Sequence, residues 1–184
     1  MNTTPIQPLF LSMLLAGAVG CGKSSESQET SQPPSLSSAE VVAINTQNEE
    51  LPYNLGSRLM PSGSNVEKLL PPQAGPYRRA PIKQAGKESI YANYQSGNST
   101  IFVELGICAD MKEAQSAVET AKAETDAEFP GAQQTFAKWQ DIVCFKTVTP
   151  TGALVAWTRG AYYFSARANG GEKELDQFMA AFPW

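Results

Sequence analysis

Eight residues near the start of the 184-residue sequence, Gly17 to Ser24, match G-x-x-x-x-G-K-S, a pattern typical of loops whose backbone amides bind nucleotide phosphates. Such a loop needs a strand before it and a helix after it, because the helix N-terminus completes the phosphate site. Residues 25–38 instead contain two consecutive prolines and show no apolar periodicity. We therefore interpret the match as coincidental and expect no nucleotide cofactor.

The second chemical group in this stretch is the thiol of Cys21. Residues 8–19 are mostly apolar, a run that is too short to span a bilayer but has the length of a signal-peptide core. The run leads into Ala18-Val19-Gly20-Cys21, which resembles the lipobox of bacterial lipoproteins. The resemblance implies that residues 1–20 are a signal peptide and that Cys21 carries a diacylglyceryl group, with its new amine acylated. The alternative is an ordinary signal peptide, cleaved or uncleaved.

The resemblance also implies a location. The residue after Cys21 is Gly22 and not Asp, which is similar to lipoproteins that are sorted to an outer membrane where the cell has one. We therefore expect a lipid-anchored protein of the cell envelope, in contact with a membrane through its N-terminal lipid and facing the periplasm or the surface.

Charge divides the chain into two parts. The net charge is −4, and residues 22–50 account for all of it, with one Lys against five Glu; residues 51–184 carry 13 basic and 13 acidic side chains. The acidic part is rich in Ser, Gln, Glu and Pro, so residues 21–50 are expected to be a disordered tether with a root-mean-square reach of roughly 30 Å. The neutral part offers no net field to nucleic acid, and no nucleic-acid partner is expected.

The chain contains no histidine, which removes the usual general base for a thiol nucleophile and the commonest zinc ligand. Cys108 and Cys144 are therefore predicted to be structural and joined by a disulfide in an oxidising envelope; two buried free thiols are the alternative. Glu104 and Asp141 have no spacing that would bring them together as a carboxylate pair. We expect no catalytic residues, no metal and no cofactor, and hence no enzyme.

An aromatic and basic cluster is the candidate ligand surface. Its residues are Trp157, Arg159, Tyr162, Tyr163 and Arg78. A guanidinium among aromatic rings suits contact with a glycan or with the edge of a peptide. Arg78 and Arg79 are neighbours on a predicted strand, so they point to opposite faces and cannot form one clamp. The alternative is that alternate aromatic residues face the core and that the basic residues line a solvated edge.

Strand-like segments lie on both sides of one long helical segment. The predicted strands are residues 77–84, 88–95, 99–108, 142–149, 153–158 and 161–168. Residues 133–140 fit either a strand or a loop. Turn residues at 96–98, 150–152 and 159–160 connect neighbouring strands closely enough to make them antiparallel.

Two helices complete the pattern. Asp110 followed by Glu113 forms a capping box, which predicts a helix that ends at Pro130-Gly131. The apolar stripe of this helix consists mostly of small side chains. A second helix is predicted over residues 172–182, and its apolar stripe is Leu175, Phe178, Met179 and Phe182.

These elements predict an α+β fold in the order βββ-α-βββ-α, an antiparallel sheet of about six strands with both helices packed on one face. The predicted domains are a signal peptide at residues 1–20, lipidated Cys21 with the tether at 21–50, a Pro-rich lead-in at 51–76 and a single α+β domain at 77–184.

The expected function follows from the predicted location in the cell envelope and from the lack of a recognisable set of catalytic residues. We expect a non-catalytic cell-envelope lipoprotein whose small domain binds a partner, an envelope protein or a glycan, or has a structural role. The alternative is an exported small-ligand binder or enzyme that uses the surface around Trp157, Arg159 and Tyr163.

Overall fold

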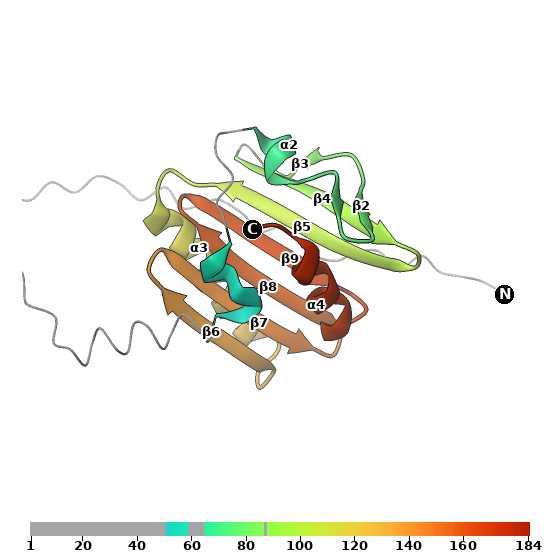
Figure 1. Cartoon of the computed structure of the whole chain (residues 1–184). Helices are drawn as coiled ribbons and strands as arrows, with labels where there is room; N and C mark the ends of the chain where they lie inside the picture. The colour runs from blue at the N-terminus through green and yellow to red at the C-terminus, as the bar shows by residue number, and fades with distance from the viewer. Residues whose placement is uncertain (1–50, 59–64, 87) are drawn as a thin grey trace, which may run out of the picture. The chain divides into compact units, whose positions relative to one another are not determined.

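One antiparallel β-sheet organises the domain (Figure 1). The computed structural model describes residues 51–58, 65–86 and 88–184; the predicted signal peptide, Cys21, the tether and the 17–24 motif lie outside the described residues. The strand order is β1-β2-β4-β5-β9-β8-β7-β6, and β3 also pairs with β4. The strands are β1 (Gln73–Ala74), β2 (Tyr77–Arg79), β3 (Lys83–Gln84), β4 (Ser89–Ser96), β5 (Ser99–Ile107), β6 (Gln133–Trp139), β7 (Ile142–Thr149), β8 (Gly152–Arg159) and β9 (Tyr162–Ala168).

The described helices are a 3₁₀ helix η1 (Pro52–Ser57), one turn of α2 (Val66–Leu69), and the longer α3 (Met111–Glu128) and α4 (Glu172–Ala181). The predicted capping box starts α3: Asp110 Oδ1 accepts from the Glu113 amide at 2.8 Å, and Glu113 Oε2 accepts from the Ala109 amide at 2.6 Å. No helix within the described ranges is long and apolar enough to cross a membrane.

The two longer helices lie on opposite faces of the sheet, which corrects the prediction that both pack on one face (Figure 1). Phe178 of α4 packs against Tyr94 of β4, whereas Val118 of α3 packs against Phe145 of β7 on the other side. The reason lies in β7, where residues Ile142 to Phe145 are all buried. A strand that is apolar at consecutive positions needs cover on both faces, because successive side chains point to opposite sides.

The sheet has nine strands, so the predicted count of about six is too low. Residues 133–140, which fitted either a strand or a loop, supply β6 at the edge of the sheet. The predicted strand over 77–84 is divided into β2 and β3, both paired with β4. Pro81 lies between them, and proline has no backbone N–H to donate to a ladder, which explains the break.

The described parts of the Pro-rich lead-in, 51–58 and 65–76, contribute side chains to the core of the domain predicted at 77–184. Leu51 and Leu55 of the first described segment, and Leu69 and Leu70 at the end of α2, are all buried in the core on the α4 side of the sheet. The prolines of the described lead-in therefore do not prevent these four leucines from packing.

Both described cysteines are free, contrary to the predicted disulfide. Cys144 lies on β7 and Cys108 directly follows β5, with β8 and β9 between these strands. Three strand spacings amount to roughly 14 Å, about twice the Cα separation that a disulfide can bridge. Burial raises the pKa of Cys144 to about 12 and, together with nearby acidic residues, that of Cys108 to about 11.

We expect iodoacetamide to alkylate both thiols in the unfolded Cys21→Ser variant without prior reduction, and mass spectrometry counts the added groups. In the folded variant at neutral pH, alkylation should be slow, and slowest at the fully buried Cys144, because only the thiolate reacts. Groups that appear only after reduction would show that the two cysteines form a disulfide.

Candidate functional site

The residues of the predicted ligand surface are dispersed. Trp157 is completely buried on the α4 side of the sheet, and its ring stacks on that of Phe164 with centroids 5.2 Å apart. Tyr162 packs against the same core, whereas Tyr163 packs on the α3 side. Arg78 is exposed on β2, four strands away from β8 in the sheet order. The predicted surface is therefore not formed as a single patch.

Arg159 holds the lead-in on the sheet. It is 6 % exposed and donates through Nη1 to the Leu55 carbonyl oxygen at 3.0 Å and through Nη2 to that of Arg58. Arg58 in turn donates to the carbonyl oxygens of Met179 and Phe182 at 2.8 and 2.6 Å, at the C-terminal end of α4. These guanidinium groups neutralise carbonyl dipoles within the fold, and burial lowers the pKa of both.

A second polar cluster fastens the same segment to β7. Lys146 Nζ lies 2.8 Å from Glu172 and 3.0 Å from Asp176, both in α4, and 5.0 Å from the ring centroid of Tyr53. The Tyr53 hydroxyl donates to Asp176 Oδ1 at 2.7 Å. Burial lowers the pKa of Lys146, but the hydrogen bonds to Glu172, Asp176 and Tyr53 outweigh it and raise the pKa overall. This cluster joins η1, β7 and α4 and is structural.

The sheet face that remains for binding lies on the α3 side of β4 and β5. Helix α3 packs mainly against β7, β8 and β9, and no other helix in the described ranges packs on this side of β4 and β5. We call this surface the β4–β5 platform. Its residues are Tyr91, Phe102, Glu104, Tyr163 and Arg167. The first four are half-buried and Arg167 is exposed, so the platform is accessible to a ligand.

The register of the strands brings the platform residues together. Glu104 is directly opposite Tyr91 on β4 and opposite Ser165 on β9, and Phe102 is opposite Arg167. The Tyr91 and Phe102 rings lie with their centroids 5.2 Å apart and their planes tilted by 31°. Residues two apart on a strand share a face, so Phe102 and Glu104 lie side by side.

The electrostatics of the platform centre on Glu104. Burial raises the pKa of this carboxyl group, and the nearby Arg167 guanidinium opposes the rise. Burial and the Glu104 charge together raise the pKa of the Tyr163 phenol. A partly desolvated carboxylate beside a guanidinium supplies strong hydrogen-bond acceptors and donors whose charges cancel. Within the described residues, no three metal-ligating side chains of the His, Cys, Asp or Glu type come together.

From the sequence alone, Glu104 is weighed only as a partner for Asp141 and is not identified as a residue of the platform. Asp141 lies in the turn between β6 and β7, where its carbonyl oxygen accepts from the Thr158 hydroxyl at 2.9 Å. The useful signal is the alternation along 99–108, which puts Phe102 and Glu104 on the face opposite the buried Val103 and Leu105. The sequence does not show that α3 leaves this part of the sheet accessible.

Comparisons with known proteins identify no family for this chain. No family model and no curated protein matches the chain. A solved structure of a GTP binding regulator from Thermotoga maritima is similar over 66 % of this chain and 88 % of its own, with 14 % sequence identity and a TM-score of 0.45. At that identity and score, the similarity says nothing about what this chain binds.

We expect Glu104→Gln to be at least as stable as the parent protein at neutral pH. Because the pKa of Glu104 is raised on folding, the folded state holds this proton more tightly, and stability is lost as the pH rises through the raised pKa. Chemical denaturation at neutral pH and below the unfolded-state pKa measures the difference, which should favour the variant only at the higher pH. Glu119→Gln, exposed on α3, is the control. A variant that is less stable at neutral pH would show that the Glu104 carboxylate stabilises the fold.

Proposed function

We propose that this protein is a lipid-anchored protein of the cell envelope whose domain binds an uncharged glycan on the β4–β5 platform without catalysing a reaction. The address rests on the lipobox-like residues 18–21 and on the acidic Ser/Gln/Glu/Pro-rich segment that follows them. Gly22 after Cys21 favours an outer membrane where the cell has one. The observation that carries the binding proposal is the half-buried Glu104 beside Arg167 and two aromatic rings.

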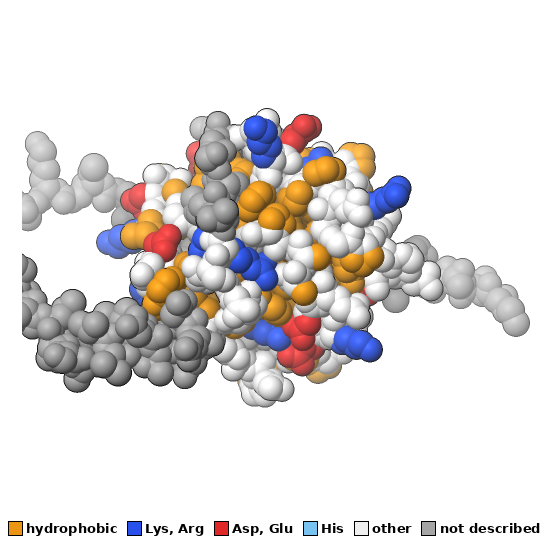
Figure 2. Space-filling view, viewed as in Figure 1, with side chains coloured by type: hydrophobic (Ala, Val, Ile, Leu, Met, Phe, Trp, Pro, Cys, Tyr) orange, Lys and Arg blue, Asp and Glu red, His pale blue; other side chains and the backbone are white. Residues whose placement is uncertain are grey.

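The chemistry of the platform favours a sugar over a charged ligand. Aromatic faces bind the apolar faces of sugar rings, and the carboxylate and guanidinium provide acceptors and donors for hydroxyl groups. The charges of Glu104 and Arg167 offset one another, so this pair gives neither a strong anion nor a strong cation a net attraction. On the opposite, α4 side of the sheet, which Figure 2 shows, positive and negative side chains are interspersed, as expected for a domain with balanced charge.

The absence of catalysis is part of the proposal. The chain has no histidine, and Arg159 of the predicted ligand surface binds other parts of the fold. Arg159 and Lys146 fasten the lead-in, and Trp157 is buried in the core. The alternative of a ligand binder or enzyme built on Trp157, Arg159 and Tyr163 loses its support, because these side chains do not form one exposed surface.

The lipid anchor is tested by labelling cells with an alkyne-bearing fatty acid. We expect the full-length protein to take up the label and Cys21→Ser to lose it, because the thiol is the attachment atom. Cys108→Ser is the matched control and should label like the parent protein. Equal labelling of the parent and Cys21→Ser would rule out the anchor without affecting the binding proposal.

Glycan binding is tested by calorimetric titration of the Cys21→Ser protein with chitotetraose, an uncharged oligosaccharide. Phe102→Ala should weaken binding about tenfold, because it removes one ring face from the platform. Met111→Ala, which truncates an exposed apolar side chain at the start of α3, should have no effect. Circular dichroism confirms that the variants are folded. No heat of binding with the parent, or equal losses in both variants, would contradict the platform as the site.

A further inference from the structure

Strand β6 is an accessible edge of the sheet. It pairs with β7 on one side, and the strand order of the described residues ends there. Alternate residues of an edge strand direct unpaired N–H and C=O groups outward, and an extended chain can pair with them. Phe136, in the middle of this strand, is 42 % exposed, which is unusual for a phenylalanine. The edge therefore combines free backbone hydrogen-bonding groups with an apolar side chain.

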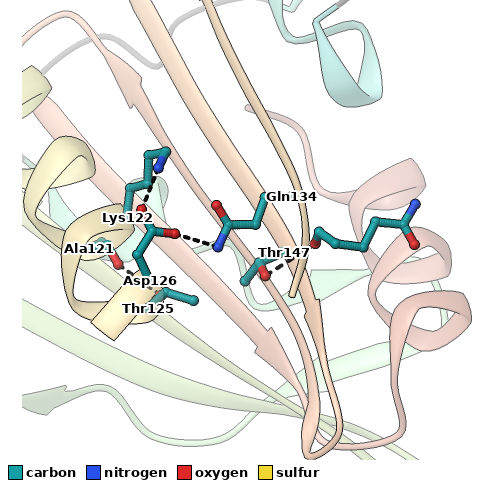
Figure 3. Close-up of polar contacts among 7 residues, drawn as sticks. Ala121, Lys122, Thr125, Asp126, Gln134 and Thr147 are labelled. Carbon is teal, nitrogen blue, oxygen red and sulfur yellow. Dashed lines mark hydrogen bonds and ion pairs between the residues drawn. The ribbon is translucent and has the colours of Figure 1, made fainter. Parts of the chain in front are cut away.

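The contacts of β6 with its neighbours hold it in an extended, ordered form. The Gln133 carbonyl oxygen accepts from the Thr147 hydroxyl of β7 at 3.3 Å, and Gln134 Nε2 donates to Asp126 Oδ1 of α3 at 2.6 Å (Figure 3). Asp126 is also paired with Lys122 one turn earlier, with 2.5 Å between Nζ and Oδ2. The strand is thus preorganised, and pairing with it would cost little additional ordering.

On the α3 side, β6 carries the Lys138 amine at one end and lies beside the Lys122–Asp126 ion pair at the other. Gln134, Phe136 and Lys138 share this side, as their pairing with residues on β7 shows. The carboxylate of Asp126 lies against Gln134 and its side chain is 43 % exposed. The Lys138 side chain is exposed and makes no hydrogen bond or ion pair with another described residue. A second β6 running in the opposite direction would bring its Lys138 amine to the partly exposed Asp126 carboxylate.

We propose that the partner at this edge is a second copy of the same chain, paired antiparallel through β6 with a two-fold axis at Phe136. Residues whose numbers sum to 272 then face one another, so that Phe136 meets Phe136 of the second copy and Gln134 meets Lys138 of the second copy. The only charge on the strand lies opposite a neutral amide. No like charges are placed directly across the interface, which would be destabilising.

Because of the two-fold symmetry, the contact between Lys138 of one copy and Asp126 of the other forms twice. Each Lys138 amine comes beside Gln134 of the other copy and thus beside the Asp126 carboxylate that Gln134 contacts. The aromatic pair at the axis removes both exposed Phe136 rings from water. A two-fold axis also makes the interface isologous and closed, so that pairing stops at the dimer and does not continue into a fibre.

This inference goes beyond the proposed function and uses residues far from the β4–β5 platform, so either proposal can fail without the other. Sedimentation velocity of the Cys21→Ser protein over a wide range of concentrations should show a reversible dimer. Lys138→Glu and Asp126→Lys should each raise the dimer dissociation constant about tenfold, because each places like charges together at two sites. Combining them should restore the dissociation constant to near that of the parent, and Lys112→Glu on α3 should leave it unchanged.

The rescue by the double variant separates a specific contact from a loss of folding, because a variant that merely unfolds is not rescued by reversing a second charge. A parent protein that is monomeric at all concentrations would overturn the proposal and would favour a strand of another protein at β6. A dimer that is insensitive to Lys138→Glu and Asp126→Lys would equally overturn it, because the copies would then meet on another surface.

Discussion

The structure depends on a sheet whose central strands are apolar on both faces. β7 and β8 contribute buried side chains to the α4 side, such as Trp157, and to the α3 side, such as Phe145. Neither face can be left to water, so one helix is needed on each. Helix α4 alone is too short to cover its face, and the lead-in completes the cover with Leu51, Leu55, Leu69 and Leu70. Burial of apolar surface thus positions both longer helices and the described parts of the lead-in.

Several charged side chains, which would otherwise be candidates for binding or catalysis, hold this cover in place. Arg159, Arg58 and Lys146 each join the lead-in or α4 to a neighbouring element, and their partners are carbonyl oxygens or carboxylates of the same chain. Among the surfaces left over are the sheet face that α3 does not reach and the outer edge of β6, with which no described strand pairs. These two surfaces, on β4, β5 and β9 and on β6, are the ones that carry the two binding proposals.

Local patterns in the sequence predict much of the fold. The capping box at Asp110 and Glu113, the stripe of α4 and the hairpin turns depend on neighbouring residues, and the structure contains them. The face chosen by each helix is not local, because it depends on which side of a distant strand needs cover. The burial of Arg159 is likewise invisible in the sequence, since its partners Leu55 and Arg58 are about a hundred positions away. Predicting that Glu104 is accessible requires knowing which strands α3 covers.

The attachment of η1 has a mechanical consequence. A pull on the chain ahead of Leu51 acts first on η1, which is held by Arg159 of a central strand and by Tyr53 through Asp176 and Lys146. These contacts share the load and transmit it to β7 and β8. Both strands are paired on each side, so they cannot be peeled from the sheet as an edge strand can. If the N-terminus is fixed to a membrane, tension from a bound polymer would be borne by the centre of the domain, and its outer hairpins would stay unloaded.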